Sequence, residues 1–129
     1  MANFQEIIKS KFDIKDIGIA NWILKIRLVR INQNSIWIGQ SQRIHDMLDE
    51  LDMWDVDLHN LPETPMASNW KHNINDQNFL NHSQITQYKS LLMKLSYIAQ
   101  QTRPDIIYAV NVLAQYQLKP TEFHFKSLL

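Results

Sequence analysis

The chain has 129 residues, the size of one small domain or of part of a larger one. Hydrophobic residues make up 45% and charged residues 20%, a composition that excludes disorder as the dominant state. No apolar run is long enough for a membrane helix and the N-terminus has no apolar signal core, so we expect an intracellular protein with no membrane partner. Because cysteine is absent, disulfides and thiolate zinc sites are excluded.

Charge is distributed unevenly along the chain, although the formal net charge is zero. Residues 1–42 hold six Lys and Arg against three acids, residues 43–66 hold one against seven, and residues 67–129 hold six against three. Basic flanks therefore surround an acidic middle. Such patterns are common on solvated helix faces and are by themselves weak support for binding to nucleic acid.

The first two predicted elements are a helix and a β-hairpin. Asn3 and Glu6 have the spacing of a capping box, which predicts a helix from Phe4 to about Phe12. Alternating side chains over residues 22–40 predict two strands joined by a polar turn near residues 32–35. The alternation gives the hairpin one apolar face and a second face that is basic and aromatic, with Lys25, Arg27 and Trp37.

The rest of the chain is predicted to be mostly helical. Caps and helical spacing of apolar residues predict helices from Ser41 to about Met53, from Ser83 to Gln101, from Pro104 onward, and from Glu122 onward. Residues 55–81 are predicted to be a polar connection with little regular structure. The predicted fold class is thus α+β and mostly helical, with a hairpin region at residues 1–40 and a helical region at residues 41–129.

Five segments then identify a resemblance to a known family. In chain order they are KSKFDIKDIGIANWILKIRL, IWIGQSQRIHDML, ETPM, YKSLLMKLSYIAQQTRPDIIYAVNVLAQY and KPTEFH. Together they resemble the C-terminal part of the reverse transcriptase domain of copia-type (Pseudoviridae) long-terminal-repeat retrotransposons, within the Pol polyprotein. The resemblance runs from about Phe4 to Leu129. The chain departs from the family at Lys25 and Met93, where glycine is common, which puts the local backbone geometry in doubt and is compatible with a decaying copy.

The resemblance implies a position within the polymerase. Residues 1–40 would be the last palm helix and a hairpin similar to the primer grip, and residues 41–129 the helical thumb and connection. The implied function is primer–template binding in an RNA-directed DNA polymerase. The implied partners are an RNA–DNA or DNA primer–template duplex and the remainder of the polymerase, in the cytoplasm (in a virus-like particle) or the nucleus.

Catalysis is not expected from this chain alone. The family enzyme resembles a two-magnesium polymerase, which needs paired carboxylates, and no YxDD motif occurs in the sequence. We therefore assign no catalytic residue, no metal ligand and no cofactor to this fragment. The scattered acids are interpreted as solvated surface charge; they are Asp13, Asp16, Asp46, Asp49, Glu50, Asp55 and Asp57.

The predicted nucleic-acid-binding residues are Lys25, Arg27, Arg30 and Trp37. The three cations can contact phosphates, and the indole can stack on a sugar or base. The alternative interpretation is an ordinary amphipathic hairpin whose basic face is merely hydrated.

Other conspicuous residues receive structural interpretations. Arg103 is expected to contact backbone carbonyls or Asp105 between two helices, and Tyr88, Tyr97 and Tyr108 are expected in the core. Trp22, Trp54 and Trp70 are expected to take part in packing, and the five scattered histidines predict no metal site; these are His45, His59, His72, His82 and His124.

Two alternatives to primer–template binding stay open. One is a non-catalytic, truncated retrotransposon remnant. The other is a helical protein-interaction module that uses the apolar stripes of the helices beginning at Ser83 and Pro104.

Overall fold

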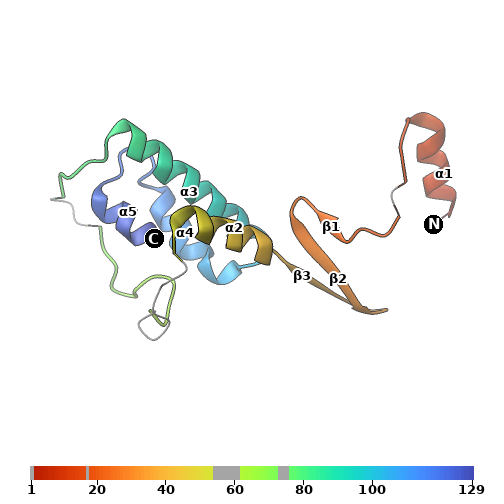
Figure 1. Ribbon diagram of the computed structural model, residues 1–129, viewed down its shortest axis with the longest axis horizontal. Coiled ribbons are helices and arrows are strands. Elements are labelled where there is room, and N and C mark those ends of the chain that lie inside the picture. The colour runs from red at the N-terminus through yellow and green to blue at the C-terminus, as the bar shows by residue number, and fades with distance from the viewer. Residues whose placement is uncertain (1, 17, 54–61, 73–75) are drawn as a thin grey trace. The chain divides into compact units, whose positions relative to one another are not determined.

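A computed structural model describes residues 2–16, 18–53, 62–72 and 76–129. It divides into two compact units, Met1–Gly39 and Gln40–Leu129, each described below by itself. The described secondary structure is α+β, with an antiparallel sheet in the first unit and helices in both (Figure 1). The predicted roles of Trp54, Asp55, Asp57 and His59 fall outside the described residues.

The first unit consists of a helix and a small antiparallel sheet. Helix α1 spans Ala2–Lys11, and the strands are β1 Trp22–Ile23, β2 Ile26–Asn32 and β3 Ser35–Gly39, in the order β1-β2-β3. Strands β2 and β3 form the predicted hairpin. Their turn is stabilised locally, because the Asn34 N–H donates to Oδ1 of Asn32 over 2.9 Å.

The chain reverses at Leu24 and Lys25, where the sequence predicts one continuous strand. Ile23 pairs with Ile26, so the turn between β1 and β2 has only two residues. Their φ angles are 51° and 65°, the signs required of both central residues in a type I′ turn. The prediction of a continuous strand is wrong because the apolar alternation runs across the turn and no glycine or asparagine marks it.

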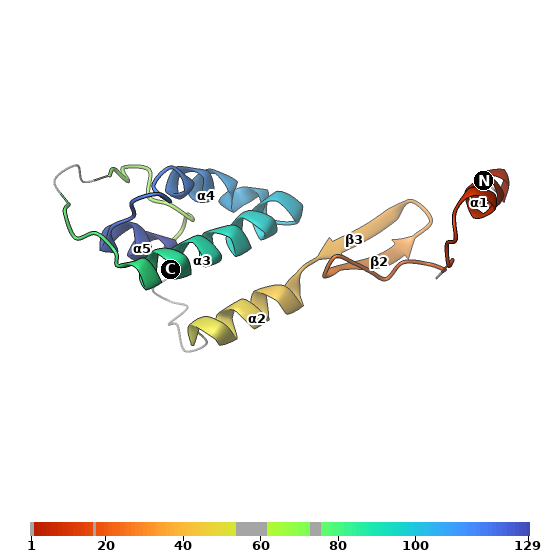
Figure 2. The same ribbon diagram turned by 90° about the horizontal axis from the view of Figure 1, so that it is seen from above.

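The second unit is a helical bundle. Its helices are α2 Ser41–Leu51, α3 His82–Gln101, the 3₁₀ turn η2 Pro104–Ile106, α4 Ile107–Ala114 and α5 Glu122–Leu128 (Figure 2). The N-cap of α3 is Asn81, two residues before the predicted cap Ser83, because Asn81 and Gln84 form a reciprocal capping box. Arg103 precedes η2 as predicted, and its guanidinium forms a bidentate hydrogen bond with the Asp105 carboxylate.

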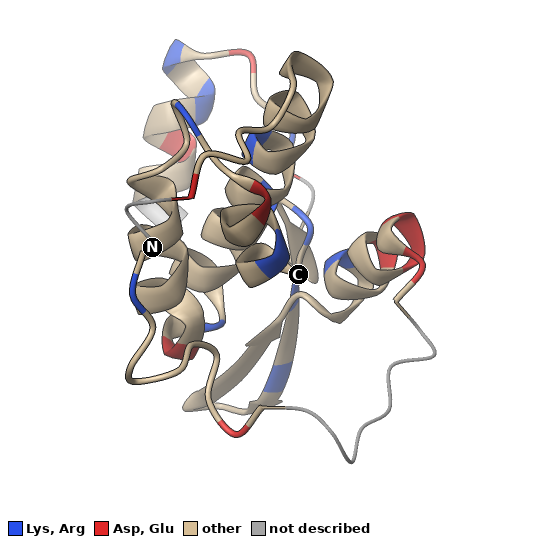
Figure 3. Cartoon of the chain, turned by 90° about the vertical axis from the view of Figure 1, so that its left-hand side faces the viewer, with Lys and Arg blue, Asp and Glu red and all other residues tan. Residues whose placement is uncertain are grey.

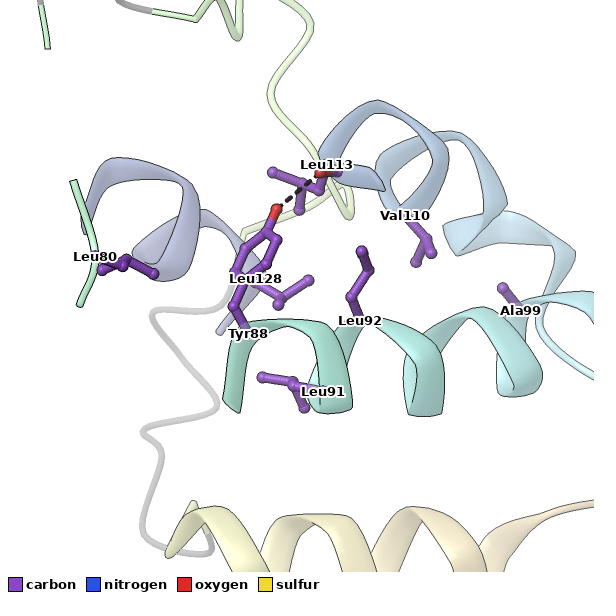
Figure 4. Packing of buried hydrophobic residues seen from close by; sticks show 8 residues of the cluster. All are labelled: Leu80, Tyr88, Leu91, Leu92, Ala99, Val110, Leu113 and Leu128. Carbon is purple, nitrogen blue, oxygen red and sulfur yellow. Dashed lines mark hydrogen bonds between the residues drawn. The ribbon is translucent and has the colours of Figure 1, made fainter. Parts of the chain in front are cut away.

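The core of the second unit lies where α3, α4 and α5 meet (Figure 4). The Tyr88 hydroxyl donates to the Leu113 carbonyl over 2.8 Å at its centre. Burial, followed by the nearby Tyr116, raises the pKa of Tyr88 to about 12, so this hydroxyl stays a donor at neutral pH. The buried cluster comprises Leu80, Tyr88, Leu91, Leu92, Ala99, Val110, Leu113 and Leu128.

The described parts of the predicted polar connection pack onto this core, although they form no helix. Leu80 is buried, and Met66 and Trp70 pack against the cluster. Trp70 also donates from Nε1 to Oγ of Ser127 in α5 over 3.1 Å. Among the tyrosines expected in the core, Tyr108 is 71% exposed, so that prediction is wrong for this residue.

Candidate nucleic-acid interface

One face of the sheet carries a basic residue next to two tryptophans. Trp22 pairs with Arg27, Arg27 also pairs with Gly39, and Val29 pairs with Trp37. Because paired residues point to the same side of a sheet, Trp22, Arg27 and Trp37 share one face. Trp22 is 54% and Trp37 44% exposed, and Arg27 is exposed as well. We call this surface, made by Trp22, Arg27, Val29, Trp37 and Gly39, the Arg27 face.

The other two predicted binding residues lie elsewhere in the first unit. Lys25 is in the β1–β2 turn. Arg30 pairs with Ile36 and lies on the opposite face, because residues an odd number of positions apart in a strand alternate sides. The structure therefore brings Arg27 and Trp37 together and separates Arg30 from them. Basic residues occur on the sheet as well as on the helices (Figure 3).

The face that carries Arg30 is otherwise aliphatic and largely open. Ile23, Ile36 and Ile38 are each about half exposed, at 50%, 52% and 48%. A small antiparallel sheet needs at least one covered apolar face for independent stability. The composition of this face indicates a surface that packs against other protein; its members are Ile23, Ile26, Leu28, Arg30, Ile36 and Ile38.

A second polar cluster, in the helical unit, joins two of the histidines that are scattered in the sequence. Nε2 of His124 lies 3.0 Å from Nδ1 of His72, and the two rings stack at 4.9 Å between centroids. Tyr116 stacks on His124 at 4.2 Å. His124 is 1% exposed. The only sequence signal for His124 is its position three residues after the helix cap Thr121; nothing in the sequence marks His72.

Hydrogen bonds fix the protonation of this pair. The Thr121 backbone N–H donates to Nδ1 of His124 over 2.9 Å, so that nitrogen carries no proton. Neutral His124 therefore carries its proton on Nε2 and donates it to His72. Burial, and then the nearby His72, lower the pKa of His124 below its ordinary value. The pKa of Asp76 is also lowered, mainly by a hydrogen bond from the Thr121 side chain and then by the Asn78 N–H.

The carboxylates of α2 do not fit a two-metal polymerase site. Glu50 is paired with Lys94, and Asp46 accepts a hydrogen bond from Gln42 over 2.9 Å. Among the described residues, no group of three or more His, Asp or Glu side chains is arranged to hold a metal ion. No step of nucleotidyl transfer can be derived from these side chains.

Comparisons with known proteins cover nearly the whole chain. It is 31% identical to the retrovirus-related Pol polyprotein from transposon RE1 of Arabidopsis thaliana, over 98% of this chain and 8% of that protein. It is 26% identical to the corresponding polyprotein from transposon TNT 1-94 of Nicotiana tabacum, over 99% of this chain and 10% of that protein. An uncharacterized mitochondrial protein of Arabidopsis thaliana is 26% identical, over 94% of this chain and 47% of its own length.

Over nearly its whole length the chain is similar to retrovirus-related Pol polyproteins of copia-type transposons, which supports a fragment of a retroelement Pol polyprotein. It spans about 8% of the length of the first curated relatives that it matches. The predicted resemblance is confirmed at the level of the Pol polyprotein. No family model matches the chain. No solved structure matches it significantly. In the described part of the chain, no helix is both long and apolar enough to cross a membrane.

Proposed function

We propose that this chain is part of a copia-type reverse transcriptase and contributes to binding of the primer–template duplex. The observation that carries the proposal is the Arg27 face, where Arg27 shares one side of an open sheet with two half-exposed tryptophans. Cations contact phosphates and aromatic rings stack on bases or sugars, so this combination suits a nucleic-acid strand. The Pol relatives support the setting, and the palm and thumb assignments stay part of the proposal.

The aliphatic face on the other side of the sheet fits the same proposal. Half-exposed isoleucines on that face need a protein surface to cover them. In a polymerase, the remainder of the enzyme would supply that surface and leave the Arg27 face toward the nucleic acid.

The two arginines of β2 provide a matched test. We expect Arg27→Ala to weaken binding of the full chain to a fluorescent RNA–DNA hybrid and to reduce the slope of log affinity against log salt by about 1. Arg30→Ala removes the same charge from the opposite face and should leave both quantities nearly unchanged. Fluorescence anisotropy at several salt concentrations measures both. An affinity that changes neither with salt concentration nor with Arg27→Ala would contradict the proposal.

The alternative of a helical interaction module gains no support from the surface that motivated it. The apolar stripes of α3 and α4 are buried against each other and against α5, through residues such as Leu92 and Val110. These stripes form the core of the helical unit and are therefore not a free surface to which a partner protein could bind.

A further inference from the structure

Gly39 lies directly beneath the indole of Trp37. A Cβ atom added to Gly39 would lie 2.2 Å from Cη2, 2.6 Å from Cζ2 and 2.9 Å from Cζ3 of Trp37. Gly39 is buried although it ends an open sheet, because the ring covers it. It does not have a positive φ. The requirement for glycine here is therefore one of space and not of backbone conformation.

The contact fixes the orientation of Trp37. Residues 37 and 39 point to the same side of β3, so an indole that occupies the space above Gly39 lies along the strand. One side of the ring meets the backbone and the side chain keeps 44% of its surface exposed. Arg27 is the cross-strand partner of Gly39, so its side chain leaves the sheet on the same face as the ring. This face therefore carries both a flat ring and a cation.

The free side of the ring suits an unpaired nucleotide better than a paired one. Bases inside a duplex are stacked on both sides by their neighbours and have no free ring face. An unpaired base at a strand end can lie on the indole while its phosphate reaches the guanidinium. Stacking of this kind tolerates every base, because each has a π face.

We propose that Gly39 is the positioning residue of a stacking platform formed by Trp37, and that the platform takes an unpaired nucleobase whose phosphate contacts Arg27. The inference rests on the proposed function and deepens it, since it names the part of the nucleic acid that the Arg27 face binds. It assigns the sequence pair Trp37 and Gly39 a joint role that neither residue has alone.

A double-mutant cycle on the full chain tests the platform. The four proteins are the wild type, Gly39→Ala, Trp37→Ala and the double variant. The ligands are a short fluorescent oligo-deoxythymidine and a blunt RNA–DNA hybrid of equal length. We expect Gly39→Ala and Trp37→Ala each to weaken binding of the single strand about five- to a hundredfold and to weaken hybrid binding much less. Gly39→Ala should have no further effect in the Trp37→Ala background, because the clash has been removed.

Tryptophan fluorescence gives a readout that a merely structural role would not change. The single strand should quench the emission of Trp37 in the wild type, and Gly39→Ala should abolish that part of the quenching. In the absence of nucleic acid, Gly39→Ala should make Trp37 more accessible to acrylamide. Circular dichroism checks that the fold is retained.

The outcomes separate the two proposals. If the wild type binds neither the single strand nor the hybrid, the proposed function is overturned. Salt-dependent binding that requires Arg27 but tolerates Gly39→Ala would overturn the platform and leave the proposed function standing. An equal loss from Gly39→Ala in the presence and absence of Trp37 would show that Gly39 acts through the backbone, and would overturn the platform too.

Discussion

Leu24 and Lys25 adopt positive φ angles of 51° and 65°, in a region that side chains with a Cβ disfavour by about 1–2 kcal/mol per residue. Glycine avoids this strain but loses about 0.5–1 kcal/mol through its greater freedom in the unfolded chain. We therefore expect Lys25→Gly to stabilise the β1–β2 turn by up to about 1 kcal/mol. Hydrogen exchange of the Leu28 amide, which donates to the Asn21 carbonyl over 2.8 Å, should slow up to about fivefold.

Lys25→Ala is the matched control for this turn, because it removes the same charge and keeps the Cβ. It should leave exchange at Leu28 unchanged. Equal slowing in both variants would show that loss of the lysine charge, and not relief of the positive φ, stabilises the turn. The resemblance to a family that commonly has glycine at position 25 pointed to this residue, but only the structure shows that a turn lies there.

Tyr88 makes one hydrogen bond in the core, from its hydroxyl to the Leu113 carbonyl. That carbonyl keeps a backbone hydrogen bond from the Tyr116 N–H at 3.1 Å, so Tyr88→Phe should remove one bond without leaving the acceptor unpaired. We expect a loss of about 1 kcal/mol in the free energy of unfolding, measured by urea denaturation. Tyr108→Phe changes a tyrosine that is 71% exposed and should have little effect. Equal losses in the free energy of unfolding for Tyr88→Phe and Tyr108→Phe would show that the hydrogen bond of Tyr88 does not stabilise the core.

At the scale of elements, the His72–His124 pair joins the start of α5 to the long connection that precedes α3. His124 accepts a hydrogen bond from the Thr121 N–H and lies next to His72 and Tyr116, while Asp76 faces the pair through Thr121. A proton added to Nδ1 of His124 would face the Thr121 N–H, so protonation of His124 breaks this contact.

This geometry predicts that the helical unit loses stability in mild acid. The pKa of His124 is lowered from 6.5 in the folded state, so the unfolded chain binds more protons and stability increases with pH. The contribution is complete above pH 6.5 and is lost as the pH falls through the lowered pKa of the folded state. The contribution of Asp76, whose pKa is lowered from 3.8, disappears only at a still lower pH. Urea denaturation followed by circular dichroism, repeated at a series of pH values, measures this dependence.

His124→Gln is the sharpest variant for that prediction. Glutamine can accept the Thr121 N–H at the same helix position but does not titrate, so the decline below pH 6.5 should flatten. A profile that stays steep in His124→Gln would assign the acid sensitivity to other groups.

The elements differ in how far the sequence determines them. Helices with a cap and a regular apolar stripe were located to within a few residues, as for α5 after Thr121, because both signals are local. The reversal at Leu24 and Lys25 carries no local turn residue and could not be found. The His72–His124 contact joins residues 52 positions apart and depends on tertiary packing. The platform of Trp37 on Gly39 needs the ring's orientation, which the alternation of a strand does not specify.

At the scale of the whole chain, burial is concentrated in one unit. All the buried apolar side chains among the described residues lie at position 80 or later, whereas the sheet of the first unit exposes isoleucines on one face and tryptophans on the other. The two compact units therefore have very different cores. The identification of these parts as palm and thumb stays a prediction, because it derives from family resemblance and not from packing.

The uneven burial predicts that the helical unit folds without the sheet. A protein comprising residues 40–129 should unfold cooperatively, with a melting temperature close to that of the helical signal in the full chain, because its core residues all lie within it. Leu92→Ala should destabilise both proteins equally, by about 2–5 kcal/mol, because it leaves a cavity between α3 and α4. In the full chain it should not alter acrylamide quenching of Trp37 at temperatures where the variant stays folded. A protein of residues 40–129 that melts without cooperativity would show that the helical unit depends on the sheet.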